Sequence, residues 1–328
     1  MAPRPPEVAR TRAIATARRL FTRTRSWLVD ETWAVGLVDR PIASFLERPS
    51  LADARWLAPP RGGYQADPFG LPDGETILVE RFDHATNLGR LEAIGRDGAL
   101  RDPQPFDPPI AGHASFPFLA TGEDGALYCL PETAAAGRLD LWRQGPDGRF
   151  CPFVPVAADL LAADPTLFRW DGRWWIAFAD ARLGAADTLC LLHAEALEGP
   201  WRPHAGNPVK RDIGSSRPAG TPFVHEGRLY RPAQDCTGCY GAAIVINRVR
   251  TLDPERFAEE PVARIAPDRA SPFPHGAHTL VAWGERTLVD AKRHGFVGAA
   301  FRRRALARLA PLLTTLGVPR RGPGEIPA

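Results

Sequence analysis

The chain has 328 residues, 44% of them hydrophobic and 24% charged, and its 41 basic and 38 acidic side chains give a formal net charge of +3. This balance argues against a nucleic-acid-binding protein, because such proteins rely on a surplus of Lys and Arg on one face. No run of about 18 apolar residues could span a membrane, and residues 1–30 lack the apolar segment of a secretory signal. We therefore expect a folded protein of the cytoplasm.

The chain begins with a basic segment. Residues 1–30 carry seven arginines among Ala, Leu and Phe, at a spacing that predicts an amphipathic helix. A strand-like run, TWAVGLV, follows at residues 32–38.

Five later segments share one pattern: a short apolar run, a turn with Gly and an acidic residue, and a second apolar run that ends in a polar residue. Each reads as a β-hairpin. The segments are residues 67–80, 116–132, 164–180, 217–235 and 275–290. Their spacing is close to the ~40–50 residues of a four-stranded propeller blade, so we predict an all-β, five-bladed β-propeller. The alternative is a chance series of hairpins in a β-sandwich.

Other runs supply the remaining strands of the blades. Residues 139–143 and 188–193 are expected as outer strands, and residues 32–38 could complete the last blade and close the ring. The predicted propeller therefore covers residues 31–295.

The chain ends in a second basic segment. Residues 296–316 place Phe and Leu at helical spacing beside four arginines, and we expect a short disordered tail in the remainder of 296–328. Both terminal helices are expected to pack on the propeller or on each other, with solvated arginines. The alternative is peripheral contact with a membrane surface or a partner enzyme. We expect a monomer.

The five cysteines do not form a disulfide framework, because their number is odd and their spacing irregular. Cys129, Cys151 and Cys190 are expected as buried thiols. Cys236 and Cys239 form one C-x-x-C, which lacks the two further ligands of a structural zinc site. We predict neither a metal nor a cofactor.

In a propeller the innermost strands line an axial channel, so residues that recur at one place in each repeat converge there. Acidic residues occupy such places along the chain: Asp67, Glu80, Glu132, Asp164, Asp180 and Asp235. The fourth and fifth repeats add Arg217, Gln234, His275, His278, Asp290 and Lys292. This composition suits a sugar or polyol held by carboxylates, or a substrate whose phosphate or carboxylate is held by the basic groups.

Paired carboxyl groups point to glycosidic chemistry. One must stay ionised as base or nucleophile, while another with a raised pKa donates a proton to the leaving oxygen. Crowded acids raise each other's pKa. The structural alternative is that several of these acids cap strands or pair with Arg81, Arg182 or Arg217.

Several motifs together carry a resemblance. They are QADPF at 65–69, SFPF at 115–118, DPTLFRWDGRWW at 164–175, LEGPW at 197–201, SRPAG at 216–220 and AQDC at 233–236. As a set they resemble the N-terminal domain of plant glucosamine inositolphosphorylceramide transferases and its bacterial relatives, over residues 30–295. That domain is itself similar to the five-bladed propellers of arabinanases, β-xylosidases, levansucrases and invertases.

The resemblance implies roles for three acids. In the hydrolase propellers the general base heads the first blade, a place matched by Asp67, and Asp164 matches a second Asp that orients the site. Glu132 is the best match for the acid, with Glu198 as a competing match. The transferase activity of the plant proteins lies in a separate C-terminal domain, which we do not expect in this chain.

Two functions follow from these observations. The first is a carbohydrate-active enzyme that hydrolyses or transfers a glycosyl unit, with Glu80, Asp180, Arg217, Gln234, Asp235, His275, His278 and Lys292 around the substrate. The second is a non-catalytic module that binds a glycan or glycolipid head group in the same channel, beside a partner glycosyltransferase. A lyase or isomerase on this scaffold is a third, weaker option, because fold alone does not fix activity.

Overall fold

The computed structural model describes residues 29–315, with side chains up to residue 309. The helix predicted in residues 1–30 and the tail predicted after residue 315 lie outside these residues, apart from residues 29 and 30. The chain forms two compact units.

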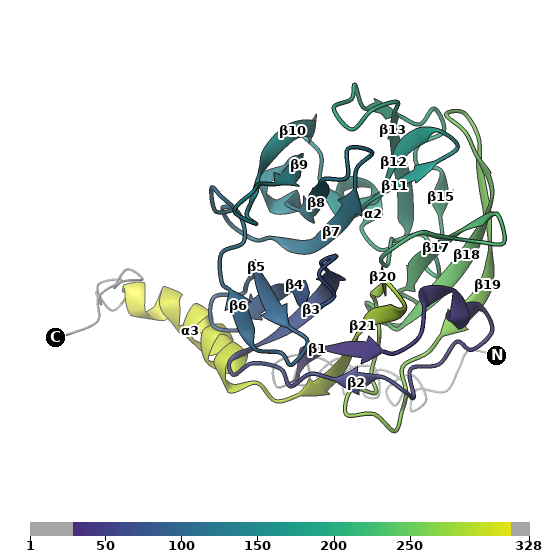
Figure 1. Cartoon of the computed structure of the whole chain (residues 1–328). Coiled ribbons are helices and arrows are strands. Elements are labelled where there is room, and N and C mark those ends of the chain that lie inside the picture. Colours follow the sequence, from purple (N-terminus) through teal and green to yellow (C-terminus); the bar gives the residue numbers. More distant parts are fainter. Residues whose placement is uncertain (1–28, 316–328) are drawn as a thin grey trace, which may run out of the picture. The chain divides into compact units, whose positions relative to one another are not determined.

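The larger unit is a ring of five antiparallel sheets, which confirms the predicted five-bladed propeller (Figure 1). Blade 1 consists of β3 (Gly63–Gly70), β4 (Thr76–Asp83), β5 (Leu88–Gly95) and β6 (Leu100–Asp102). Blade 2 consists of β7 (Ser115–Thr121), β8 (Leu127–Glu132), β9 (Arg138–Gln144) and β10 (Phe150–Ala158). Blade 3 consists of β11 (Ala162–Trp170), β12 (Arg173–Asp180), β13 (Thr188–Ala194) and β14 (Arg202–Pro203), with β15 (Lys210–Arg211) paired to β13.

The remaining two blades close the ring. Blade 4 consists of β16 (Phe223–His225), β17 (Arg228–Asp235), β18 (Ala243–Leu252) and β19 (Phe257–Ile265). Blade 5 consists of β20 (Leu280–Trp283), β21 (Arg286–Gly295), β1 (Asp30–Val38) and β2 (Arg55–Trp56). The run at residues 32–38 therefore completes the last blade, as predicted. Short helical segments connect the strands: η1 (Ile42–Leu46), η2 (Ala134–Ala136) and α2 (Ala181–Gly184).

The inner strands of the first three blades share one irregularity. Asp67, Phe116 and Asp164 each precede a proline and have φ angles of +50°, +44° and +49°. Each lies where the pairing of the inner strand with the next strand shifts register. Positive φ is strained for a residue with a side chain, and a bulge re-aims the side chains near it. The bulge therefore changes the direction of the side chains at the same place in each of the first three blades.

The fourth inner strand is shorter than the predicted run at 217–224, because only Phe223–His225 forms a ladder. Prolines at 218 and 222 cannot donate to a ladder. The intervening backbone instead links two blades: Leu280 N–H donates to Ala219 O (2.7 Å), and Thr221 N–H donates to Leu280 O (3.1 Å).

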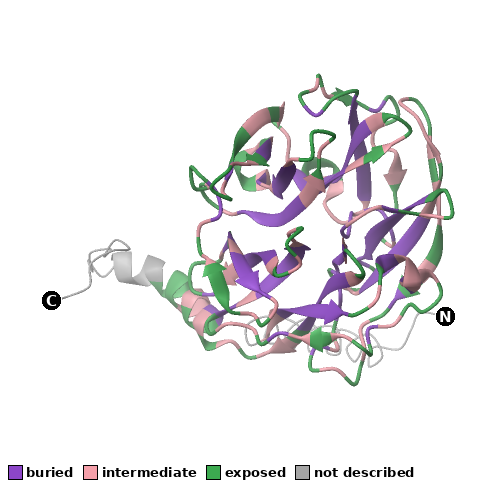
Figure 2. Ribbon diagram, in the orientation of Figure 1, coloured by how far each residue is buried: buried purple, intermediate pink, exposed green. Residues whose placement is uncertain are grey.

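Burial follows the layers of the blades, with the inner and middle strands largely buried and the loops and outer edges exposed (Figure 2). Phe69, Phe116 and Phe118 pack against one another between the first two blades, with ring centroids 5.0–6.3 Å apart. All five cysteines are free; Cys129 and Cys190 are buried as predicted. Cys151 is exposed, contrary to prediction, because it lies on the outermost strand of its blade, β10.

The smaller unit contains α3 (Gly298–Thr315), close to the helix predicted at 296–316. Within this unit Arg304 forms an ion pair with Asp30 (2.5 Å), and the Arg303 guanidinium donates to His84 O (2.9 Å). Among the described residues, no helix is both long and apolar enough to cross a membrane.

Gly220 provides a test of how the fourth and fifth blades join. A Cβ there would lie 2.1 Å from Leu280 O, and φ is +121°. Gly220→Ala should lower the free energy of unfolding by about 3 kcal/mol or more, from strain and steric overlap together. Gly227→Ala is the matched control, because φ is +70° there but no atom lies within 4 Å of the added Cβ. It should cost about 1 kcal/mol in urea denaturation; equal losses in both variants would contradict the proposed steric contact.

Candidate active site

Asp67 lies at the bulge of β3, with its side chain held by three groups from other blades. Thr279 Oγ1–H donates to Asp67 Oδ1 (3.1 Å), Phe116 N–H donates to Oδ2 (3.3 Å), and His278 Nε2 lies 3.4 Å from Oδ1. Burial raises the pKa of Asp67 to about 7, against the lowering effect of His278. Near neutral pH this carboxyl group therefore titrates.

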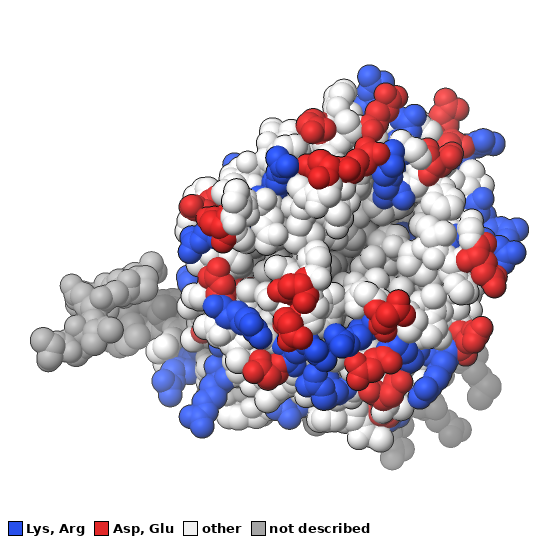
Figure 3. Space-filling model, in the orientation of Figure 1, with Lys and Arg blue, Asp and Glu red and all other residues white. Residues whose placement is uncertain are grey.

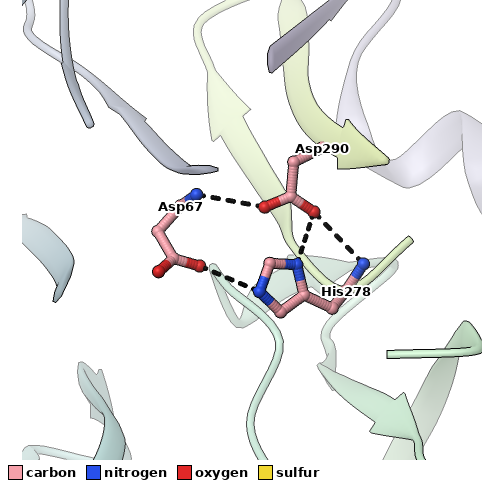
Figure 4. Close-up of side chains that lie close together, drawn as sticks. All are labelled: Asp67, His278 and Asp290. Atoms are coloured by element: carbon pink, nitrogen blue, oxygen red, sulfur yellow. Dashed lines mark hydrogen bonds and ion pairs between the residues drawn. The ribbon is translucent and has the colours of Figure 1, made fainter. Parts of the chain in front are cut away.

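Asp290, on β21, contacts Asp67 and the residues that hold it (Figure 4). Its Oδ1 accepts from the backbone N–H groups of His278 (3.2 Å) and Thr279 (3.0 Å) and lies 2.7 Å from His278 Nδ1. Its Oδ2 accepts from Asp67 N–H (3.0 Å). Burial lowers the pKa of His278, but the charges of Asp290 and Asp67 outweigh this and raise it overall. Asp290 thus aims the His278 ring, with Nε2 toward Asp67.

Asp164, at the bulge of β11, forms the second centre of the site. Arg217 binds it with two bonds, Nε to Oδ2 (2.6 Å) and Nη2 to Oδ1 (3.2 Å), and Gln234 Nε2–H donates to Oδ2 (2.6 Å). A bidentate pair of this kind is among the strongest polar contacts in proteins. The charge of Asp164 is therefore balanced from the fourth blade.

Glu132 ends β8 and connects the second and third blades. Its Oε2 accepts from Asp164 N–H (2.8 Å), and the residue is partly exposed. Burial of the carboxyl group and the charge of Asp164 raise the pKa of Glu132 to about 8, against the charge of Arg217. At neutral pH this group holds a proton that it can donate.

Glu80 ends the apolar part of β4 and belongs to the same group of acids. It is 6% exposed, and burial together with the charges of Asp67 and Glu132 raises its pKa well above the usual range. His113 Nε2 lies 3.8 Å from Glu80 Oε1. Burial lowers the pKa of His113, so a neutral pair forms this side of the site.

An aromatic wall, Trp33 and Tyr240, adjoins the acids, and sequence reasoning missed it. The ring of His278 lies 4.0 Å from that of Trp33 and 5.3 Å from that of Tyr240. The Arg217 guanidinium lies 5.0 Å from the Tyr240 ring, and Lys292 Nζ–H donates to Tyr240 O (2.5 Å). Trp33 is buried, whereas Tyr240 is 39% exposed and can present its ring to a ligand.

The structure brings seven of the predicted site residues together around Asp67 and Asp164, and Lys292 adjoins them beneath Tyr240. The seven are Asp67, Glu80, Glu132, Asp164, Arg217, Gln234 and His278.

Three others have different surroundings. Asp180 accepts from Arg182 N–H (2.9 Å) at the start of α2. Asp235 is bound by Thr237 and by Arg264 (2.9 Å), and these hydrogen bonds and the Arg264 charge lower its pKa despite burial. His275 is exposed, and its backbone N–H donates to Lys292 O (2.9 Å).

A buried ion pair outside the site holds the loop that carries Arg217. Arg231 binds Glu259 through Nε (2.9 Å) and Nη2 (2.6 Å), and both side chains are almost fully buried. The same guanidinium donates to Ser215 O (2.8 Å) and Ser216 O (3.1 Å). Because Arg217 follows directly, this pair positions the guanidinium that binds Asp164.

Asp67, His278 and Asp290 could also surround a metal ion, since their ligand atoms lie within 4.8 Å of one another (Figure 4). In the structure these atoms contact one another and the Thr279 and Phe116 donors. The face of the ring drawn in Figure 3 is hollowed at its middle.

A family model described as "Glucosamine inositolphosphorylceramide transferase 1, N-terminal" matches residues 110–270, which span blades 2 to 4. The predicted resemblance is confirmed. Asp67, His278 and Asp290 lie outside the stretch that matches this family.

Curated relatives from plants carry the same family name. Glucosamine inositolphosphorylceramide transferase 1 from Oryza sativa subsp. indica is 31% identical over 219 residues, which cover 62% of this chain and 29% of the relative. The protein of that name from Arabidopsis thaliana is 30% identical over 207 residues, covering 60% of this chain and 27% of the relative. The chain thus matches less than a third of the length of these relatives.

Solved structures with similar folds include a glycosyl hydrolase from Bacteroides ovatus, with a TM-score of 0.47 and 11% identity, covering 70% of this chain and 83% of that one. A thermostable family-43 glycoside hydrolase has a TM-score of 0.43 and 13% identity, covering 64% of this chain and 76% of that one.

The raised pKa values predict how stability depends on pH. Asp67 and Glu132 keep protons up to about pH 7 and about pH 8 in the folded protein, whereas the ordinary pKa values of the two groups are 3.8 and 4.5. The unfolded chain releases these protons first, so the free energy of unfolding should fall as pH rises from 5 to 8. Glu132→Gln removes one such proton and should make this fall shallower, by up to about 1.4 kcal/mol per pH unit.

Urea denaturation at a series of pH values measures this slope. Glu255→Gln is the control, because Glu255 is an exposed acid that should leave the slope unchanged. Identical slopes for wild type and Glu132→Gln would show that Glu132 is ionised in the folded protein across this range.

Proposed function

We propose that the chain hydrolyses or transfers a glycosyl unit, with Glu132 as general acid, Asp67 as general base and Asp164 as the residue that tunes the acid. One observation carries this proposal. Glu132, with a pKa raised to about 8, accepts a hydrogen bond from the backbone of Asp164, whose own charge is balanced by Arg217. Acid–base catalysis at a glycosidic bond requires two carboxyl groups in different environments, so that one holds a proton to donate while the other is ionised.

In the acid step, Glu132 donates its proton to the glycosidic oxygen. That oxygen takes the proton as the bond from the sugar carbon to the oxygen breaks, and the bonding pair stays on the leaving group. The Glu132 side chain is partly exposed, so it can meet a substrate. Asp164 N–H holds Glu132 Oε2 at 2.8 Å and leaves Oε1 to carry the proton.

In the base step, Asp67 takes a proton from water or from an acceptor hydroxyl. The deprotonated oxygen then bonds to the sugar carbon, and solvent exchange afterwards returns the proton from Asp67 to Glu132. Thr279 and His278 hold Asp67 Oδ1, so the orientation of the carboxylate is set before substrate binds. Asp290 acts as a positioning residue through the His278 ring.

Tyr240 would supply part of the sugar contact. The residue is 39% exposed and its ring lies beside Arg217 and His278, and aromatic rings present a large, rigid, amphipathic surface. The neutral Glu80 offers further hydrogen bonds for sugar hydroxyls, whereas the buried Gln234 amide donates to Asp164 Oδ2 and Pro218 O.

A second candidate is a non-catalytic module that binds a glycan or glycolipid head group beside a partner glycosyltransferase. One observation favours it: the oxygens of Asp67 and Asp164 already accept hydrogen bonds from the protein. Carboxylates occupied in this way can shape a polar cavity without acting on its ligand. The family name of the plant relatives is consistent with this role.

The enzyme proposal predicts a narrow pH optimum. Below about pH 7 Asp67 takes up a proton and ceases to be a base, and above about pH 8 Glu132 loses the proton it must donate. The kcat/KM for a responsive aryl glycoside should therefore be bell-shaped, with its maximum between these values. A panel of nitrophenyl pentosides and hexosides in both anomers, followed at 400 nm, identifies the substrate and then gives the profile.

Variants separate the two candidates. Asp67→Asn and Glu132→Gln should each lower kcat by about 10²–10⁴-fold, whereas Glu255→Gln should not. If no glycoside in the panel is turned over but a glycan binds wild type in calorimetry and Tyr240→Ala abolishes that binding, the binding module replaces the enzyme. Full turnover by Asp67→Asn would remove Asp67 from the mechanism.

A further inference from the structure

A cationic row crosses the outer part of blade 3, away from the inner strand that carries Asp164. His193 on β13 pairs with Trp175 on β12 and with Arg202 on β14. Arg173 lies two residues before Trp175, so its side chain is on the same face of the sheet. Three adjacent strands thus present two guanidinium groups and an imidazole to one side of the blade.

The three groups surround a cavity of 300 Å³, lined also by Glu195, Gly199 and Pro200. Arg173 Nη1 lies 3.4 Å from His193 Nδ1, and the His193 ring packs 5.5 Å from that of Trp175. His193 is only 8% exposed, so its ring is a fixed wall of the cavity. A volume of this size is at the lower end of small-molecule pockets, which begin at about 300 Å³.

The charges of the row are unbalanced. Among the described residues, no carboxylate lies within ion-pair distance of Arg173 or Arg202, whereas other arginines of the ring, such as Arg217 and Arg231, bind acids. Like charges on neighbouring strands repel one another. Burial lowers the pKa of His193, and the charges of Arg173, His204 and Arg202 lower it further. The cavity is therefore a place where an anion would be stabilised.

We propose that this cavity is an oxyanion site that takes a phosphate group, either free or as the ester of a small molecule. Guanidinium groups bind phosphate oxygens with paired hydrogen bonds, and a neutral imidazole adds an N–H donor. The site is separate from the carboxylate cluster, and it does not rest on the function proposed above. Glu195, an exposed residue at the rim, opposes an anion and limits its affinity.

Isothermal titration of the full chain with inorganic phosphate, at constant ionic strength, tests the site. Arg173→Gln and Arg202→Gln should each weaken binding by about tenfold or more, the loss of one charge-assisted contact. Arg228→Gln is the matched control, because Arg228 is exposed on β17 and forms no ion pair with any of the described residues, and it should bind phosphate as wild type does. Glu195→Gln should strengthen binding.

Glucose 6-phosphate, with glucose as its control, distinguishes the two sources of the group. Tighter binding than inorganic phosphate indicates an ester, and equal binding indicates the free ion. Neither Arg173→Gln nor Arg202→Gln breaks an ion pair among the described residues, although Arg173→Gln alters the contact with His193, so thermal denaturation should show both variants folded. Phosphate affinity that is unchanged in both, or lowered equally by Arg228→Gln, would overturn the proposal.

Discussion

The bidentate contact between Arg217 and Asp164 makes the acidic centre of this propeller possible. Five blades converge on one axis, and the first three and the fifth bring carboxyl groups to it, where each ionised group loses most of its hydration. An unpaired charge that is buried costs roughly several kcal/mol, so the charges must be paired or the groups protonated. Here Arg217 balances Asp164, His278 lies between Asp67 and Asp290, and Glu80 and Glu132 retain protons. The remaining polar contacts follow from this arrangement.

The first three blades share one repeated bulge, but the ring is not symmetric. At the bulge of each of the first three blades a residue with positive φ precedes a proline, but the second blade has Phe116 where its neighbours have Asp67 and Asp164. The side chain of Phe116 joins the apolar core, while its backbone N–H donates to Asp67. One blade therefore supplies a backbone donor and an apolar side chain where the other two supply an acid.

Sequence reasoning could find the propeller and the centre of the site because both depend on local signals. Gly-acidic turns mark the hairpins, and Asp-Pro at the head of a repeat marks Asp67 and Asp164. It could not distinguish Asp235 from Asp290, since each is the polar residue at the end of the second apolar run of its repeat; only the structure shows that one binds Arg264 and the other His278. Tyr240 and the Arg231–Glu259 pair were missed for the same reason. Their roles arise from contacts between segments distant in sequence, which no spacing records.

The strand that closes the fifth blade has a consequence for the order of events during synthesis. β1 is made first among the described strands, yet its partner β21 is made last, more than 200 residues later. Pairing them requires closing a very long loop, which costs entropy and slows folding. While the ribosome builds blades 1 to 4, the edge of β1 stays without its partner, and the ring is sealed only after β21 has emerged. In the nascent chain this edge of β1 therefore stays open until β21 has been made.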